Sequence, residues 1–281
     1  MEKYITYQDK IDELILDARH PQSRNKIFVL VEGIDDVKLY PKFFNEFCKI
    51  EPIPGGVTKL ENSLTDIPRH VKRINLLAIR DADFMHIENK QAIFSNLFLT
   101  DTHDSETMLI ANDETLSAVI YEFLPYNSLP INDLRIQFLQ AVEFLGYLRW
   151  YNNLNNFEFN FRGLSVNKLL DVNAKFTIKR IELIKEIVKR SPNKHFKDEI
   201  TIIQEVENLF DSSYSLLQIC CGHDVIKVIA AYFTSFDKSY EVNDRTVVSH
   251  LRTAYHLSHF KQSELFRKLS LYAQQKKLYL F

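Results

Sequence analysis

The first hundred residues alternate between short apolar runs and amphipathic stretches. The apolar runs, rich in β-branched residues, predict buried strands at 27–31, 49–53, 74–79 and 97–99. Apolar residues at helical spacing predict helices at 1–20, about 35–47 and 58–67. We expect Thr58 to cap the last of these helices, because Glu61 follows it at the capping-box spacing. This order of strands and helices predicts the α/β class, with a small parallel, Rossmann-like sheet flanked by helices.

Beyond about residue 105 the apolar pattern becomes helical. Helical periodicity marks the segments 105–123, 133–151, 177–190, 197–219, 223–235, 244–257 and 261–276. An Asn- and Phe-rich stretch from Asn152 to Gly163 interrupts them and predicts a loop or a hairpin. We therefore expect a helical lead-in at 1–23, an α/β domain at 24–125 and a mainly helical region at 126–281. The last region would bind substrate, a second copy or a partner.

An acidic motif follows the first predicted strand. Glu32 comes directly after residues 27–31, and Gly33 allows the backbone to turn tightly. Asp36 lies four residues further on, about one helical turn, so its side chain can point back to the same edge. Open α/β sheets place their chemistry at the carboxyl ends of their strands, so this edge is a candidate site.

A second acidic motif follows the strand at 74–79. Asp81 and Asp83 flank Ala82 in a segment that we expect to be extended, where alternate side chains share one face. Carboxylates gathered around one point repel each other strongly unless a cation neutralises them. No Cys or His cluster is evident in the sequence, and oxygen ligands suit Mg²⁺ or Mn²⁺. We therefore predict one or two such ions, the first held by Glu32, Asp81 and Asp83.

A third acidic element, residues 101–106, follows the last predicted strand. Asp104 and Glu106 could bind a second metal ion, with Asp36, or could begin a helix, since acids favour the first helical turn. For Asp101 the capping role is the better prediction.

The composition indicates an intracellular setting. Cys48, Cys220 and Cys221 form neither a disulfide framework nor a zinc-binding pattern, which fits a reducing cytoplasm. The N-terminus lacks the apolar segment of a secretory signal, and no apolar run approaches membrane-spanning length. We therefore expect a cytoplasmic protein that does not bind a membrane.

The net charge of −2 conceals segregated charge. Residues 81–122 carry a local balance of −8, whereas 172–197 and 245–281 each carry +6. The basic segments could hold a polyanion while metal ions neutralise the acidic one. A solvated helix face is the other explanation for each basic segment.

Two other phosphate-handling families use similar acidic parts. A haloacid-dehalogenase-type phosphatase carries Asp-x-Asp in its first strand motif, whereas here Glu32 precedes that motif. A response-regulator receiver needs a later Ser or Thr and a Lys, which this sequence does not place convincingly. Neither order of residues fits.

The sequence VEGIDD at 31–36, together with IRDADF at 79–84, resembles the Toprim domain, the catalytic fold of topoisomerases, bacterial primases and OLD-family nucleases. The segment TDTHDSETML at 100–109, followed by a long helical half, is similar to a narrower group. These are the OLD-like and PARIS-type (AriB-like) toxin effectors of prokaryotic anti-phage defence, which partner ABC-type ATPases. Residues 24–110 carry the resemblance, and Gly222-His223-Asp224 adds a weaker match.

The resemblance implies that Glu32 is the catalytic glutamate, Asp36 the acid one turn later, and Asp81 and Asp83 the metal-binding pair. It also implies a Mg²⁺-dependent nuclease that hydrolyses RNA, tRNA in particular, in preference to DNA, under the control of an ATPase sensor. A homodimer is the expected active form. Strand passage and primer synthesis are poor predictions, because no tyrosine nucleophile and no primase zinc module can be assigned. The alternative is a non-catalytic subunit that regulates an ATPase complex.

Four further residues carry open alternatives. His223 either lies near the metal ions, as a proton-transfer or phosphate-contacting group, or belongs to a helix cap with Gly222. His103 carries the same alternatives, a group near the metal ions or a surface histidine, and the surface position is the default expectation. Lys59 and Arg80 border the acidic motifs and could contact the scissile phosphate, or could simply balance local charge.

Overall fold

The structure is a computed structural model that describes residues 5–171, 176–192, 197–236 and 242–281. These residues pack into two compact units. Unit 1 comprises the described residues up to Ala82, together with Lys90–Asp101 and Tyr255–Phe281. Unit 2 comprises Asp83–Asn89 and the described residues of Thr102–Ala254. The C-terminal segment therefore packs with the N-terminal α/β part of the chain.

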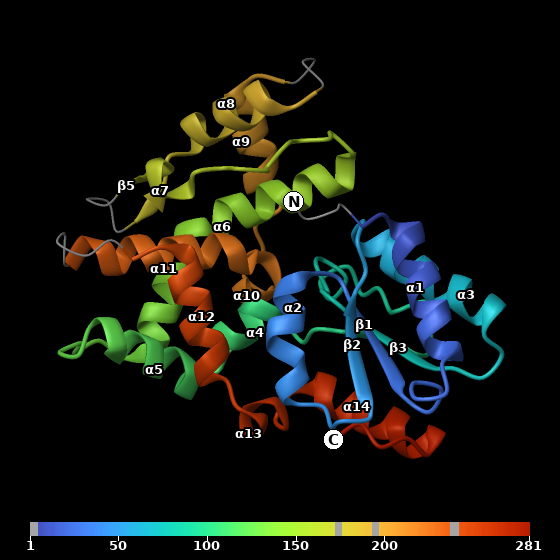
Figure 1. Ribbon diagram of the computed structural model, residues 1–281. Helices are drawn as coiled ribbons and strands as arrows, with labels where there is room; N and C mark the ends of the chain where they lie inside the picture. Colours follow the sequence, from blue (N-terminus) through green and yellow to red (C-terminus); the bar gives the residue numbers. More distant parts are fainter. Residues whose placement is uncertain (1–4, 172–175, 193–196, 237–241) are drawn as a thin grey trace. The chain divides into compact units, whose positions relative to one another are not determined.

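Unit 1 contains a four-stranded parallel sheet with the strand order β2-β1-β3-β4 (Figure 1). Its strands are β1 (Ile27–Val31), β2 (Cys48–Pro52), β3 (Asn75–Arg80) and β4 (Leu97–Leu99). This confirms the predicted α/β class, and the strand bounds lie within about one residue of the prediction. Every residue of β1 is buried, because both faces of the sheet are covered by other elements.

Helices cover both faces of this sheet. The helices α1 (Tyr7–Arg19) and α3 (Val57–His70) share an apolar core with Phe28, Leu30 and Leu76 of the strands. Side chains alternate along a strand, so Phe98 points to the opposite face from its neighbour Leu97, a member of that core. There Phe98 meets Tyr272 of α14 (Glu264–Lys276), with ring centroids 5.4 Å apart.

The second face is completed by the short helical elements of unit 1. These are α2 (Ile34–Leu39), the 3₁₀ turn η1 (Tyr40–Lys42) and α13 (Leu257–Phe260). Phe43, which follows η1, stacks on Phe260 at a centroid distance of 4.6 Å. The C-terminal tail is held as well, since the Asn45 N–H donates to the carbonyl of Leu280 at 2.9 Å.

Two helix predictions in unit 1 need correction. The helix expected at 35–47 ends at Leu39 and gives way to η1, because Pro41 lacks the N–H that a continued helix needs. The helix expected to be capped by Thr58 begins at Val57, and its N-cap is Gly56 with φ 76°. A left-handed N-cap favours glycine, so Thr58 lies inside the first turn.

Unit 2 is mainly helical, as predicted. Its helices are α4 (Ser105–Ala111), α5 (Asp113–Phe123), α6 (Ile131–Asn155), α7 (Val166–Leu169), α8 (Arg180–Arg190), α9 (Glu199–Glu207), α10 (Leu216–Ile219), α11 (Gly222–Phe236) and α12 (Asp244–Ala254). A small antiparallel pair, β5 (Leu170–Asp171) and β6 (Thr177–Ile178), joins them. Asn112 divides the helix expected at 105–123, because its side chain accepts the Thr115 N–H and caps α5.

The long helix α6 is the centre of unit 2. It packs against α5, α9, α10, α11 and β6, and is therefore buried around most of its circumference. Gly146 permits the closest of these contacts, since a Cβ there would lie 2.7 Å from the carbonyl oxygen of Ile219. The stretch expected to begin at Asn152 as a loop or a hairpin is helical up to Asn155, the end of α6, and continues from Asn156 as a loop.

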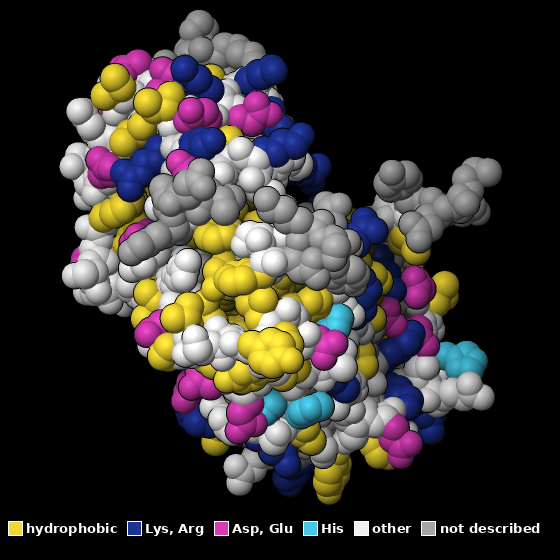
Figure 2. Space-filling view, turned by 90° about the vertical axis from the view of Figure 1, so that its left-hand side faces the viewer, with side chains coloured by type: hydrophobic (Ala, Val, Ile, Leu, Met, Phe, Trp, Pro, Cys, Tyr) yellow, Lys and Arg dark blue, Asp and Glu magenta, His cyan; other side chains and the backbone are white. Residues whose placement is uncertain are grey.

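An apolar groove lies at the C-terminal ends of α5 and α11. Phe123, Leu124, Tyr232 and Phe236 help to line it, and Tyr126 beside them is 96% exposed. Figure 2 faces the side on which α5 and α11 are seen in Figure 1, and hydrophobic side chains gather in the middle of that view. Such a surface is typical of a protein contact. Among the described helices, none combines the length and apolar character needed to cross a bilayer.

Candidate functional site

The carboxyl edge of the sheet in unit 1 brings Glu32 and Asp81 together. The parallel register aligns Leu30 of β1 with Ala78 of β3, so the two strands end side by side. Glu32 follows β1, and Asp81 follows β3. The Oε1 atom of Glu32 accepts the backbone N–H of Asp81 at 3.1 Å. Both side chains are partly exposed. The contact joins the Glu32 carboxylate to the backbone of Asp81, so it places the two residues at one edge of the sheet, and the convergence of their carboxylates stays a prediction.

The backbone on which Asp81 lies is held from two sides. Glu32 accepts the N–H of Asp81, and the hydroxyl of Thr100 accepts the next N–H, from Ala82, at 2.9 Å. Thr100 follows β4, and its own N–H donates to the Arg80 carbonyl at 3.1 Å. Thr100 is a positioning residue that the sequence did not indicate, because its contact depends on β4 pairing with β3.

Asp36 points back toward the same turn, as predicted. An Oδ2 atom of Asp36 accepts the N–H of Gly33 at 3.0 Å, which ties the first turn of α2 to the residue after Glu32. The neighbouring Asp35 instead pairs with Lys38 at 2.9 Å and is half exposed. Asp36 thus orders the turn that carries Glu32.

The two cationic candidates of unit 1 make contacts of their own. Arg80 is 8% exposed and pairs with Glu61, with its Nη1 atom 2.7 Å from Oε1 of the glutamate. This geometry supports the charge-balancing alternative for Arg80. Lys59 is exposed, and its Nζ lies 4.6 Å from the ring centroid of Tyr7, within cation–π range.

The chain leaves the extended conformation at Asp83. Its φ of 48° is left-handed, so the prediction of an extended segment through Asp83 is wrong. Asp83 belongs to unit 2, where its N–H donates to the His103 carbonyl at 2.8 Å. That Asp83 shares an ion with Glu32 and Asp81 stays a prediction.

Asp101 is a helix cap, as predicted, but for a distant helix. Its two carboxylate oxygens accept the N–H groups of Glu264 and Leu265, each at 2.7 Å, at the start of α14. We expect Asp101→Ala to lower the free energy of unfolding by about 1–2 kcal/mol, because two N–H groups lose their acceptor. Thermal unfolding followed by far-ultraviolet circular dichroism would measure it. Asp101→Asn retains one acceptor oxygen and should cost less; an equal loss in both variants would contradict the capping role.

A second cluster of ionisable groups lies in unit 2. Among the residues that the structure describes, two groups of three potential metal ligands have ligand atoms within 4.8 Å of one another. One contains His103, Asp104 and Cys221; the other contains Asp104, Glu106 and His223. His103 is only 4% exposed, so its expected surface position is wrong. Its ring lies edge-on to that of Phe84, with centroids 5.0 Å apart, and faces the Gln218 carbonyl.

Backbone contacts fix the two segments of this cluster against each other. The N–H of His103 donates to the Leu217 carbonyl at 2.9 Å, and its Nδ1 lies 3.2 Å from the Gln218 carbonyl. Asp104 caps α4 by accepting the Thr107 N–H at 2.8 Å, and its other oxygen accepts the Gly222 N–H at 2.6 Å. Asp104 therefore has the helix-start role, and at the same time faces the start of α11.

His223 lies beside Glu106. Its Nδ1 is 4.0 Å from Oε2 of Glu106, while its side chain remains 64% exposed. A hydrogen bond with Cys221 raises the pKa of His223, and the negative charge of Glu106 raises it further. Burial acts in the opposite direction, and the resulting pKa is about 10. Burial alone would lower the pKa of His103, but Cys221 and Asp104 outweigh it and raise that pKa to about 9. This cluster attracts positive charge.

Gly222 is required by the close approach of the two segments. A Cβ at this position would lie 2.5 Å from Oδ1 of Asp104 and 2.5 Å from Cβ of Glu106. We expect Gly222→Ala to destabilise unit 2 by about 1–3 kcal/mol through overpacking. Urea unfolding followed by fluorescence would measure it, since the single tryptophan, Trp150, lies in unit 2.

The matched control for this substitution is Gly33→Ala. The nearest atom to a Cβ at Gly33 lies 3.9 Å away, so we expect little change in the fluorescence-detected midpoint. A Gly222→Ala variant as stable as the wild type would show that the α4 and α11 segments are not packed as described.

Asp224, the last residue of the Gly222-His223-Asp224 segment, forms a buried ion pair with Arg149. Its side chain is 2% exposed, and its Oδ2 atom lies 2.8 Å from Nη2 of Arg149 in α6. Lys227 lies 3.4 Å from the other oxygen. Asp224 therefore anchors the first turn of α11 to the centre of unit 2 and is not free to bind an ion or a substrate.

The basic segments are partly neutralised within the fold. In α8, Arg180 pairs with Glu207 and Arg190 with Glu186, which supports the solvated-face explanation for these two arginines. Two other lysines of the first basic segment, Lys175 and Lys194, lie outside the described residues.

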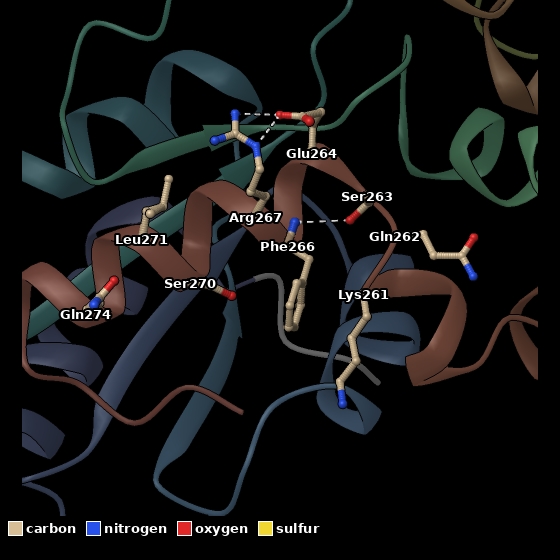
Figure 3. A pocket seen from close by; sticks show the side chains of 9 residues that line it. All are labelled: Lys261, Gln262, Ser263, Glu264, Phe266, Arg267, Ser270, Leu271 and Gln274. Atoms are coloured by element: carbon tan, nitrogen blue, oxygen red, sulfur yellow. Dashed lines mark hydrogen bonds and ion pairs between the residues drawn. The ribbon is translucent and has the colours of Figure 1, made fainter.

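The second basic segment includes a shallow groove along α14 (Figure 3). Its lining includes Lys261, Phe266 and Arg267. Arg267 forms an ion pair with Glu264 at 2.6 Å, and the Ser263 hydroxyl accepts the Phe266 N–H. Both contacts belong to the first turn of α14. None of the candidate acidic residues lines the groove. Glu264 partly neutralises its positive charge, which leaves a weaker attraction for a polyanion.

Comparison with known proteins adds no assignment. The sequence matches neither a protein-family model nor a curated protein.

Proposed function

We propose that this chain is a Mg²⁺-dependent phosphodiesterase that hydrolyses nucleic acid through the carboxylates at the edge of the unit 1 sheet. One observation carries the proposal: Glu32 and Asp81 follow adjacent parallel strands and meet through a hydrogen bond of 3.1 Å. Parallel sheets bind their ligands at this edge. The same residues carry the resemblance to Toprim nucleases.

The residues at this edge suit a hard cation. The side chains of Glu32, Asp36 and Asp81 offer oxygen atoms alone as ligands, and the adjacent Arg80 pairs through Nη1 with Glu61. Oxygen donors are those that Mg²⁺ and Mn²⁺ prefer. When bound, such an ion would polarise the scissile phosphoryl group and stabilise the leaving oxygen. The support is the chemistry of these donors, and hydrogen bonds from the Asp81 and Gly33 N–H groups hold the carboxylates of Glu32 and Asp36.

Each residue has a proposed role. Glu32, Asp81 and Asp83 would hold the ion, and Glu32 could also relay a proton. Asp36 orders the turn after Glu32 and could help to hold a second ion, as could Asp104 or Glu106. Thr100 keeps the Asp81 backbone in position. Lys59, which is exposed, remains a candidate contact for substrate phosphate.

The proposed substrate and partners rest on the resemblance and on charge. We propose RNA, tRNA in particular, over DNA, and a role as a toxic effector controlled by an ABC-type ATPase in anti-phage defence. Lysines and arginines of the two basic segments that remain solvent-exposed would contact the phosphate backbone, which makes binding salt-dependent. A homodimer is the proposed active form.

The test is incubation of the purified full chain with mixed RNA and DNA, in Mg²⁺ and then in excess chelator. We expect cleavage, mainly of RNA, in Mg²⁺ and its loss in chelator. Because the effector would be held by its ATPase, the same test includes the chain co-expressed with an ATPase encoded beside it. Cleavage unaffected by chelator, or none in any of these conditions, would contradict the proposal and favour the non-catalytic subunit.

A further inference from the structure

We propose that unit 2 contains a site for a transition-metal ion such as Zn²⁺, bound by His103, Cys221 and Asp104, with Glu106 and His223 beside it. The ligand atoms of His103, Asp104 and Cys221 lie within 4.8 Å of one another, and those of Asp104, Glu106 and His223 do so as well. Asp104 belongs to both groups, so one ion could use donors from either. The site belongs to unit 2, and its imidazole and thiol donors differ in chemistry from the carboxylates that follow the strands of unit 1.

The two segments that supply these donors are held together without the ion. The Leu217 carbonyl accepts the backbone N–H of His103, and the Gln218 carbonyl faces the ring of His103. The N–H of Gly222 donates to the carboxylate of Asp104. The missing Cβ of Gly222 allows the close approach. A binding site on a rigid backbone needs little ordering when a ligand arrives, which favours binding.

The orientation of His103 is that of a metal ligand. A carbonyl oxygen can only accept, so the Nδ1 atom that lies 3.2 Å from the Gln218 carbonyl carries the proton of that contact. In the neutral ring the lone pair is then on Nε2. Metal-binding histidines commonly donate their second ring N–H to a backbone carbonyl in this way, which fixes the ring and its tautomer.

The donor set selects the metal. An imidazole, a thiolate and a carboxylate together suit Zn²⁺ or Co²⁺ and do not suit Mg²⁺, which prefers oxygen ligands. Asp104 has lone pairs to spare, since each of its two oxygens accepts one N–H and a carboxylate offers about four acceptor sites. Asp104 would then bind the transition-metal ion in place of a second Mg²⁺.

Burial gives the site a need for positive charge. Asp104 is 3% and Glu106 is 5% exposed, and two neighbouring carboxylates in a desolvated place repel each other. A divalent cation would neutralise both. Protons on His103 and His223 are the competing source of positive charge, and a direct binding measurement separates the two.

The experiment uses Co²⁺ as the probe, added to the metal-free full chain. We expect saturation at one ion in unit 2, with a thiolate-to-cobalt charge-transfer band in the near ultraviolet that Zn²⁺ abolishes and excess Mg²⁺ does not. Cys221→Ser should remove the band, and His103→Gln should weaken Co²⁺ binding by at least about tenfold. Far-ultraviolet circular dichroism confirms that each variant is folded.

Two matched variants complete the test. Cys48→Ser changes a thiol in unit 1 and should leave the band intact. Glu32→Gln should also leave the band intact, because Glu32 belongs to unit 1. The band therefore tests the metal site in unit 2, and the cleavage assay tests the nuclease proposal independently of it. Absence of the band in the wild type, or a band that survives in Cys221→Ser, would overturn the inference.

Discussion

Replacing Glu32 with glutamine is expected to reduce Mg²⁺-dependent cleavage of RNA by at least about 100-fold, with unit 1 still folded. Substitutions that only support metal ligands cost roughly 10–100-fold, so loss of a ligand should cost at least as much. The fold should survive because the glutamine carbonyl can still accept the Asp81 N–H that Glu32 accepts at 3.1 Å. Only the negative charge is removed, which isolates the proposed role in binding the cation.

The matched control is Asp35→Asn. Asp35 lies in the same acidic motif, but its side chain is half exposed and pairs with Lys38. Initial rates of RNA cleavage at saturating Mg²⁺, with melting temperatures of each variant, should show activity close to wild type for Asp35→Asn. Full activity in a folded Glu32→Gln variant would exclude Glu32 from the chemistry.

Replacing Arg149 with methionine is expected to lower the free energy of unfolding of unit 2 by about 3–5 kcal/mol. Removing one partner of a buried ion pair leaves the other charge uncompensated in a poorly solvated place. Asp224 is 2% exposed, and among the described residues the cation that would still pair with it is the more distant Lys227, at 3.4 Å. Urea unfolding followed by the fluorescence of Trp150 would measure the loss.

Arg180→Met provides the comparison for the buried pair. Arg180 pairs with Glu207 and lies over the ring of Phe144, as Arg149 lies over that of Phe161, but both partners of the Arg180 ion pair are about 40% exposed. Exposed pairs contribute about 0–1 kcal/mol, so this variant should unfold near the wild-type midpoint. The double variant Arg149→Met with Asp224→Leu should recover part of the loss. Equal effects of Arg149→Met and Arg180→Met would show that Asp224 is not buried against Arg149.

The sheet could be predicted because its signal is local. Each strand is a short apolar run, and β1 is apolar throughout because both of its faces are buried. The helix boundaries were less predictable, since they depend on single residues. Pro41 shortens one helix, and Gly56, with its left-handed φ, starts another before Thr58.

The candidate site divides in the same way. Glu32 and Asp81 could be predicted, because parallel strands end at one edge and each acid directly follows a strand. The cluster of His103 and Cys221 could not. His103 and Gln218 are 115 residues apart in sequence, and only the packing of α4 against α10 and α11 brings their segments together. No spacing rule for metal ligands describes such a pair.

The decisive measurement is the anomalous diffraction signal of Mn²⁺ in crystals of the full chain soaked with that ion. We predict a peak within coordinating distance of carboxylate oxygens of both Glu32 and Asp81, which disappears in crystals of Glu32→Gln. A peak bound elsewhere, with no signal beside these two carboxylates at saturating Mn²⁺, would contradict the proposed metal-dependent nuclease.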